Sequence, residues 1–157
     1  NRYLGTIDVG IRGLAPLGGE NYLLKCEIEG CAGYKHENFY NVQPWVNSLF
    51  NNIAYSYSQK FLTSQLIVVT DASLASGGLY DYKNTWAPPH KTHRIGTDID
   101  VRSKNIPERN RADFKKIVCK NYGSPKLEYP RQDNEHYHLY FFPYKSLGKL
   151  CKGEIPI

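Results

Sequence analysis

Four of the five histidines in this chain fall in two short windows of the sequence. The first window contains His90 and His93, and the second contains His136 and His138. Imidazole and carboxylate groups are ligands that zinc prefers, and a catalytic zinc site uses three protein ligands and leaves the fourth position to water. The two windows, together with the aspartates that follow the first, therefore supply a complete ligand set for one zinc ion, with acid and base groups to spare.

The spacing within each window allows the side chains to converge. Gly96 permits a turn between His93 and Asp100, so the end of a loop and the start of a strand can approach one ion. A third ligand must then come from elsewhere in the sheet. Because side chains alternate along a strand, His136 and His138 project from the same face, and one can bind metal while the other stands beside it.

Simpler interpretations of both windows stay open. A His-x-His pair in a strand is more often a surface or cross-strand pair, and a polar loop that leads into a strand also explains the first window. A metal-free, β-rich adhesion or interaction domain is therefore an alternative to a metal site.

The elements that must position these residues can be read from periodicity. Apolar residues recur at three- and four-residue intervals over 44–61 and 107–122, which predicts two amphipathic helices, the second stopped by Gly123. Residues 65–71 form a continuous β-branched run typical of an interior strand. Further strands are expected at 97–101, 126–130 and 135–142, with Asp98 and Asp100 on one face of the first of these.

Two other regions lack helical periodicity. Residues 1–36 carry short apolar stretches separated by glycine-rich turns, which predicts strands and hairpins, and residues 72–96 are expected to form a long loop. The resulting order of elements predicts an α+β fold, with a mainly antiparallel sheet, flanking helices and the zinc site on the face of the sheet.

Composition narrows the class of protein. The chain has 157 residues and a formal net charge of +5, which fits one globular domain with an anionic partner. Its basic residues are scattered and no nucleic-acid module is recognisable, so no nucleic-acid partner is expected. No apolar run is long enough to span a bilayer. The chain contains no Met, so we expect a mature fragment of a longer protein, with additional domains on its N-terminal side.

The four cysteines form an even set without a Cys-x-x-Cys pair, which argues against a structural zinc knuckle. If the chain is exported, pairing of Cys26 with Cys31 and of Cys119 with Cys151 is the simplest arrangement. Four cysteines allow three connectivities, and four buried free thiols are a further alternative.

The stretch PPHKTHRIGTDIDV together with EHYHL resembles a known zinc metallopeptidase group. That group includes penicillin-insensitive murein endopeptidases, lysostaphin-type endopeptidases, D-alanyl-D-alanine peptidases and the Hedgehog signalling domain. Its pattern is His, six residues, Asp, and later His-x-His. The chain is most similar to murein endopeptidase-like domains of bacterial surface proteins, over about residues 35–142. We therefore expect a β-rich N-terminal segment at 1–36, which the resemblance does not cover, and a metallopeptidase-like domain at 37–157.

The resemblance also implies roles for individual residues. Zinc would be held by His93, Asp100 and His138, and His136 would be the catalytic histidine. Glu135 is a second candidate for the catalytic base, because Glu135 and His138 also fit the Glu-x-x-His arrangement of the dipeptidases in this group.

Other residues would lie around the ligands. His90 and Asp98 match positions beside the ligands in murein endopeptidases and would contact the substrate or support the ligands. A substrate groove could be lined by Arg94, Tyr82, Trp86 and Tyr140, although solvent-facing or packing roles explain such residues as well. One departure is Asp133, which stands where murein endopeptidases have a further histidine.

These expectations define a function. The chain is predicted to be a secreted or envelope-located zinc peptidase that hydrolyses peptide bonds, with the stem-peptide crosslinks of peptidoglycan as substrate. The alternative is a zinc-containing, non-catalytic binding or signalling module of the same fold.

Overall fold

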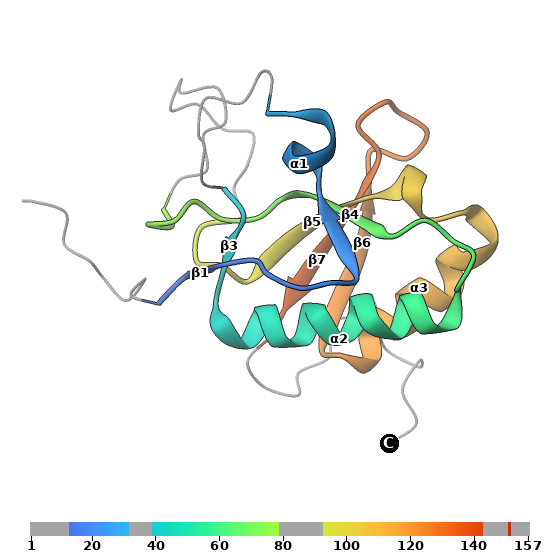
Figure 1. Ribbon diagram of the computed structural model, residues 1–157, viewed down its shortest axis with the longest axis horizontal. Coiled ribbons are helices and arrows are strands. Elements are labelled where there is room, and N and C mark those ends of the chain that lie inside the picture. Colours follow the sequence, from blue (N-terminus) through green and yellow to red (C-terminus); the bar gives the residue numbers. More distant parts are fainter. Residues whose placement is uncertain (1–12, 32–38, 79–92, 143–150, 152–157) are drawn as a thin grey trace, which may run out of the picture.

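The computed structural model describes residues 13–31, 39–78, 93–142 and 151. Within these ranges it contains three α-helices and seven strands, so the expected α+β class is confirmed (Figure 1). The elements in chain order are β1 (Ala15–Pro16), β2 (Tyr22–Leu24), α1 (Lys25–Glu29), β3 (Asn41–Val42), α2 (Pro44–Lys60), β4 (Ile67–Asp71), β5 (Asp98–Arg102), a 3-10 turn (Ser103–Asn105), α3 (Glu108–Lys120), β6 (Gly123–Glu128) and β7 (His136–Phe141).

The main sheet has five strands in the order β2-β4-β5-β7-β6. β2 and β4 are parallel, whereas the other three pairings are antiparallel, which confirms the expected mainly antiparallel sheet. β4 lies inside the sheet, as its β-branched run predicts. β5 occupies the centre, so its backbone is paired on both sides and its side chains are rigidly placed.

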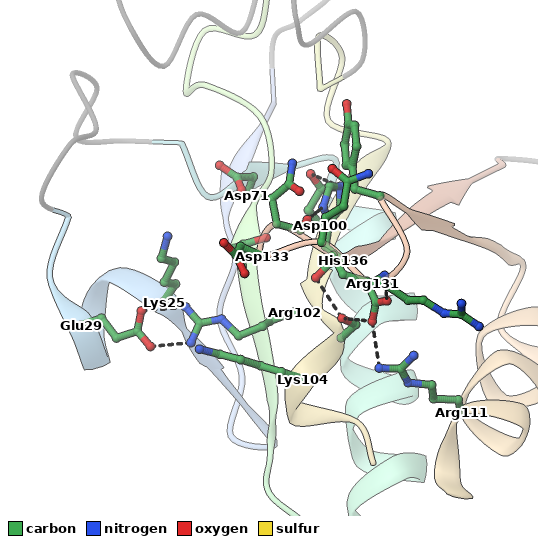
Figure 2. Close-up of a pocket in the computed structure, with 16 residues that line it drawn as sticks. Lys25, Glu29, Asp71, Asp100, Arg102, Lys104, Arg111, Arg131, Asp133 and His136 are labelled. Carbon is green, nitrogen blue, oxygen red and sulfur yellow. Dashed lines mark hydrogen bonds and ion pairs between the residues drawn. The ribbon is translucent and has the colours of Figure 1, made fainter. Parts of the chain in front are cut away.

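The two faces of the sheet differ in chemistry. Ile99 and Val101 of β5 point toward the core, and α2 and α3 lie together on that side of the sheet (Figure 1). The helix predicted at 44–61 is α2, whose buried stripe is Val46, Phe50, Ile53, Ala54 and Tyr57. Asp100, Arg102 and His136 point to the other side (Figure 2). Strand alternation thus separates an apolar, helix-covered face from a polar face.

The helix predicted at 107–122 is present as α3, but its end differs from the expectation. The helix stops at Lys120, and the residue with left-handed backbone is Tyr122, at φ 58°. Gly123 is not the helix stop and instead opens β6, which therefore begins earlier than the predicted strand at 126–130. A Cβ atom on Gly123 would lie 2.7 Å from Val118 Cγ1, so close packing explains the glycine.

The N-terminal part also differs from the expectation of strands alone. Residues 22–29 lie in the segment predicted to form strands, but the chain changes from β2 to α1 after Leu24. Gly30, with φ 73°, ends the helix by donating its backbone N–H to the Cys26 carbonyl. A helix of 5 residues is too short for its periodicity to be recognised. Residues 1–12 and 32–38 of the segment predicted to form strands and hairpins, and most of the predicted loop, at 79–92, lie outside the described residues. No helix in the described ranges is long and apolar enough to cross a membrane.

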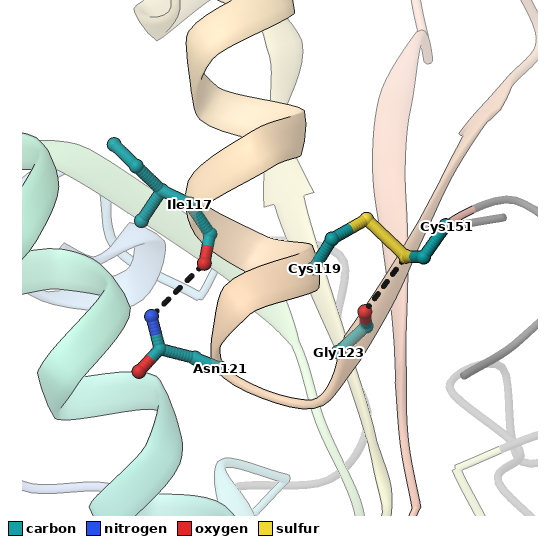
Figure 3. The surroundings of a disulfide bond; sticks show 5 residues. All are labelled: Ile117, Cys119, Asn121, Gly123 and Cys151. Carbon is teal, nitrogen blue, oxygen red and sulfur yellow. Dashed lines mark hydrogen bonds between the residues drawn. A yellow bond between two sulfur atoms is a disulfide. The ribbon is translucent and has the colours of Figure 1, made fainter. Parts of the chain in front are cut away.

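Both expected disulfides are present. Cys26 and Cys31 enclose the end of α1, with a Cα–Cα distance of 4.7 Å. Cys119, near the end of α3, is joined to Cys151, and the Cys151 sulfur lies 3.3 Å from the Gly123 carbonyl oxygen (Figure 3). The second disulfide therefore ties a distant part of the chain to the point where α3 turns into β6. Disulfides of this kind are compatible with an extracellular location.

The two disulfides should differ in their contribution to stability. They span sequence separations of 5 and 32 residues, for which loop-closure entropy predicts about 2 and about 4 kcal/mol, respectively. We expect the Cys119→Ala, Cys151→Ala double variant to lose about 2 kcal/mol more unfolding free energy than the Cys26→Ala, Cys31→Ala double variant. Urea denaturation followed by circular dichroism measures this difference, and equal losses would contradict it.

Candidate metal centre

The carboxylate of Asp100 lies at the centre of a group of three imidazoles. Asp100 is 2% exposed, and its Oδ1 lies 2.7 Å from His138 Nδ1. Its other oxygen, Oδ2, lies 3.2 Å from His93 Nε2 and 3.4 Å from His136 Nε2. The side chains of His93, His136 and His138 come from two separate parts of the sequence and meet at one carboxylate.

Strand pairing brings two of these histidines to Asp100. In the antiparallel register of β5 and β7, Asp100 lies opposite His138, and Arg102 lies opposite His136. Cross-strand partners in such a pair have side chains about 5 Å apart on the same face of the sheet. The predicted alternation of side chains is thus present in both strands, and the strand register brings the side chains of Asp100 and His138 into contact.

His93 reaches the site from the turn that precedes β5. The turn allows this because Gly96 has φ 76°, and a Cβ atom there would lie 2.8 Å from the backbone nitrogen of Gln43. Gly96 donates its N–H to Ser73 Oγ, and its carbonyl accepts the backbone N–H of Gln43. His93 itself has φ 61°, an uncommon conformation for a residue other than glycine.

Asp98 supports both ends of the cluster. Its Oδ2 accepts the backbone N–H of His93 at 3.3 Å, and its Oδ1 lies 3.4 Å from His138 Nε2. Asp98 thus lies beside the expected ligands, at the position that the resemblance implies.

The charges in the cluster depend on one another. Burial lowers the pKa of His138, but hydrogen bonds to Asp100 and Asp98 more than compensate and raise it to about 9. Burial also opposes ionisation of Asp100, yet the adjacent His93 and His138 hold the pKa of its carboxyl well below the usual range. The pKa of His93 is raised, because its attraction to Asp100 outweighs its burial. Without a metal, a protonated imidazole provides the positive charge beside Asp100.

Two sets of side chains in this part of the chain could hold a metal ion. His93, Asp100 and His138 each offer one donor atom, and these atoms lie within 4.8 Å of one another. Glu128, His136 and His138 form a second such set. The first set has the two nitrogens and one oxygen of a common zinc site, and zinc would replace the proton between the buried carboxylate and imidazole. The residues present therefore fit a zinc ion, although the geometry does not identify the metal.

His136 is the most accessible of the three histidines, with 15% of its side chain exposed. Its Nδ1 lies 2.8 Å from the carbonyl oxygen of Asn134, which can only accept, so Nδ1 carries the proton. The lone pair of neutral His136 is then on Nε2, which faces Asp100 and lies 3.7 Å from Glu128 Oε2. This nitrogen can accept a proton at the edge of the cluster.

Glu135 is turned toward a different group of residues. Its carboxylate accepts hydrogen bonds from the backbone N–H of Arg131 at 2.7 Å, from Ser103 Oγ at 2.7 Å and from Arg111 at 2.9 Å. The Arg131 and Ser103 hydrogen bonds lower the pKa of Glu135, with a further contribution from the charge of Arg111. These contacts fix the turn between β6 and β7, in which Tyr129 and Arg131 both have positive φ.

An open groove of about 1000 Å³ runs over the polar face of the sheet (Figure 2). Asp71, Asp100, Asp133 and His136 line one part of it, and several basic side chains line another. The groove therefore gives a solvent-exposed route to the edge of the histidine cluster.

The other predicted site residues lie near the cluster or outside the described residues. Arg94 is exposed beside His93, and its carbonyl accepts the backbone N–H of Gly78. Tyr140 packs against His138, with ring centroids 4.2 Å apart. His90 lies outside the described residues, as do Tyr82 and Trp86.

Sequence reasoning missed two acidic residues at the site. Glu128 faces His136 across the β6–β7 pair. Side-chain alternation in the two predicted strands would have indicated this contact only if the strand register had been known. Asp71 lies opposite Asp100 because a register shift between Val69 and Asp71 changes the pairing of β4 and β5. Such bulges often occur beside functional sites, but no residue in this stretch signals one.

Comparisons with known proteins do not identify a family. No protein-family model matches the chain, and no curated protein or solved structure is significantly similar to it.

The ion pair between Asp100 and His138 should make the stability of the zinc-free chain depend on pH. Because the pKa of His138 is raised from 6.5 to about 9 in the folded chain, this stabilisation is complete below pH 6.5 and is lost as the pH rises through 9. We expect the unfolding free energy to fall by up to about 3 kcal/mol over this interval.

Urea titrations in EDTA at several pH values measure this effect. His138→Asn is the control, because asparagine does not titrate and the variant should lack this part of the decline. A zinc-free chain that shows the same pH dependence as His138→Asn would contradict the expectation.

Proposed function

We propose that the chain is a secreted, zinc-dependent peptidase. The observation that supports this most strongly is the position of Asp100, which bridges His93 and His138 while His136 lies beside it. These four residues are also the ones that the resemblance to the murein endopeptidase group assigns to the ligands and the catalytic histidine. In this proposal residues 37–157 form the peptidase-like domain.

His93, Asp100 and His138 would hold the zinc ion. When bound, zinc would lower the pKa of water and polarise the carbonyl of the bond to be cleaved. Asp98 keeps His138 and the backbone of His93 in place through its two oxygens. Strand pairing and the turn before β5 therefore hold the three proposed ligands close together.

His136 is the proton acceptor in this proposal. The Asn134 carbonyl holds its Nδ1 proton, which leaves Nε2 available for the proton that the attacking water loses. Glu135 acts indirectly, because its hydrogen bonds to Ser103 and the Arg131 backbone fix the turn that carries Asn134. We therefore favour His136 over Glu135 as the general base.

Peptide crosslinks of peptidoglycan are the proposed substrate. The resemblance supports this choice, and the net charge of +5 favours an anionic polymer. A groove lined by polar and charged residues suits a peptide backbone, and the two disulfides are compatible with secretion to the cell envelope.

The depth of the site favours one rival. His93, Asp100 and His138 are all at most 2% exposed, which would also suit a structural zinc ion in a non-catalytic binding or signalling module. The exposed position of His136 at the groove supports the enzyme, because a purely structural site does not need a further imidazole.

Replacing His136 separates the two functions. We expect His136→Ala to retain about one zinc per chain and to lose about a hundredfold or more in hydrolysis, since a positioned base contributes about 10²–10⁴-fold. His93→Ala, the comparison variant, should lose both zinc and activity. Elemental analysis gives the zinc content, and mass spectrometry of purified muropeptides gives the products. Zinc-loaded chain that cleaves neither muropeptides nor peptides would favour the binding module.

Glu135→Gln tests the assignment of the general base. The glutamine keeps an acceptor for Ser103 Oγ, so we expect activity to fall less than about tenfold. A loss of about 10²–10⁴-fold, with zinc and stability retained, would instead make Glu135 the base. Measurements of kcat and KM beside His136→Ala distinguish these outcomes.

A further inference from the structure

We propose that Lys25, Arg102 and Lys104 form a subsite for a carboxylate of the peptide substrate. This inference rests on the proposed function, since it concerns the peptide bound at the same groove. These three residues line the groove that also contains Asp100 and His136 (Figure 2). We refer to them below as the basic subsite.

Arg102 fixes the basic subsite to the candidate metal centre. It follows Asp100 by two residues on β5, and both side chains point to the polar face of the sheet. The guanidinium binds the carboxylate of Glu29 with two nitrogens, the second at 2.8 Å. Glu29 lies on α1, whose end is closed by the disulfide between Cys26 and Cys31. Arg102 therefore has a fixed direction, which a flexible surface residue lacks.

All three basic side chains act on the carboxylate of Glu29. The hydrogen bond from Arg102 lowers the pKa of Glu29, and the charges of Lys104 and Lys25 contribute to the same effect. Three cations thus surround one carboxylate. Lys104 is exposed and makes no hydrogen bond or ion pair with a described residue. An anionic group bound in this part of the groove would give the ammonium group of Lys104 a partner.

The opposite part of the groove has the reverse character. Asp71, Asp100 and Asp133 lie near His136, whereas Lys25, Arg102 and Lys104 lie together near Glu29 (Figure 2). Two further basic residues of the groove, Arg111 and Arg131, lie on the other side of His136, and Arg111 is already paired with Glu108 and Glu135. A carboxylate is repelled by the first group and attracted by the second, so the groove orients a peptide that carries one. A surface whose charges served only solubility would not need this separation.

The spacing limits where the carboxylate lies in the substrate. Two residues along a strand span about 7 Å, which is the separation of Asp100 and Arg102 along β5. An extended peptide that lies along the groove has the same rise per residue. Its carboxylate would therefore lie within about two residues of the cleaved bond. It belongs either to an acidic side chain or to the C-terminus of a short peptide.

A scan of substrates tests the subsite. A fluorescence-quenched neutral peptide is prepared with Glu, or with Gln as its neutral match, at each position, and each version carries a free or an amidated C-terminus. We expect kcat/KM to be about tenfold higher for Glu than for Gln at one position, since a charge-assisted hydrogen bond contributes more than a neutral one. A preference that follows the free C-terminus instead assigns the subsite to a terminal carboxylate.

Charge reversal at Lys104 gives the decisive comparison. Lys104→Glu should abolish the Glu-over-Gln ratio and favour Lys at the same substrate position. Lys116→Glu, on the exposed side of α3 and outside the groove, makes the same change in net charge and should preserve the ratio. Equal ratios in the Lys104 and Lys116 variants, or an active chain that prefers neither Glu over Gln nor a free over an amidated C-terminus, would overturn the subsite and leave the peptidase intact.

A separate binding measurement covers the case in which no peptide is cleaved. The proposed function would then fail, and the ¹⁵N-labelled, zinc-free chain would be titrated with the Glu and Gln peptides by NMR. Tighter binding of the Glu peptide, with shifts at the amides of residues 102–104 that Lys104→Glu removes, supports the subsite. Equal affinities or shifts elsewhere overturn it.

Discussion

The structure of the site depends on one buried negative charge. Asp100 lies in the central strand of the sheet with 2% of its surface exposed, where an isolated carboxylate would be strongly unfavourable. The imidazoles of His93, from the preceding turn, and of His138, from β7, offset that cost. The same arrangement could accept either a proton or a cation, because both supply the positive charge that the carboxylate requires. Metal binding at this position would therefore be coupled to folding.

One face of the sheet packs into the hydrophobic core, and the opposite face carries the charged cluster. Strand alternation directs Ile99 and Val101 into the core under α2 and α3 and leaves Asp100 and Arg102 on the opposite face. Because the hydrophobic core holds one side of β5, the opposite side of the strand can carry the charged cluster. On the charged face, the ion pair between Arg102 and Glu29 connects α1 to the sheet.

The turn between β6 and β7 connects structural and chemical roles. Glu135 binds Ser103 and the Arg131 backbone, and the same turn presents the Asn134 carbonyl that determines which nitrogen of His136 carries the proton. In the proposal, Glu135 therefore acts on the reaction through its contacts with this turn. The Glu-x-x-His spacing of Glu135 and His138 does not distinguish that role from a direct one.

The sequence alone determined the elements and most of the candidate site. Helical and strand periodicity predicted α2, α3, β4, β5 and β7, and the histidine spacing indicated His93, Asp100, His136 and His138, because these patterns reflect local geometry. It could not determine the helical α1, the start of β6 at Gly123, or the roles of Glu128 and Asp71. Those depend on a short helix closed by a disulfide, on close packing against Val118, and on strand register and a bulge. Only tertiary structure decides them, because each is a contact between residues whose separation along the chain carries no periodic signal.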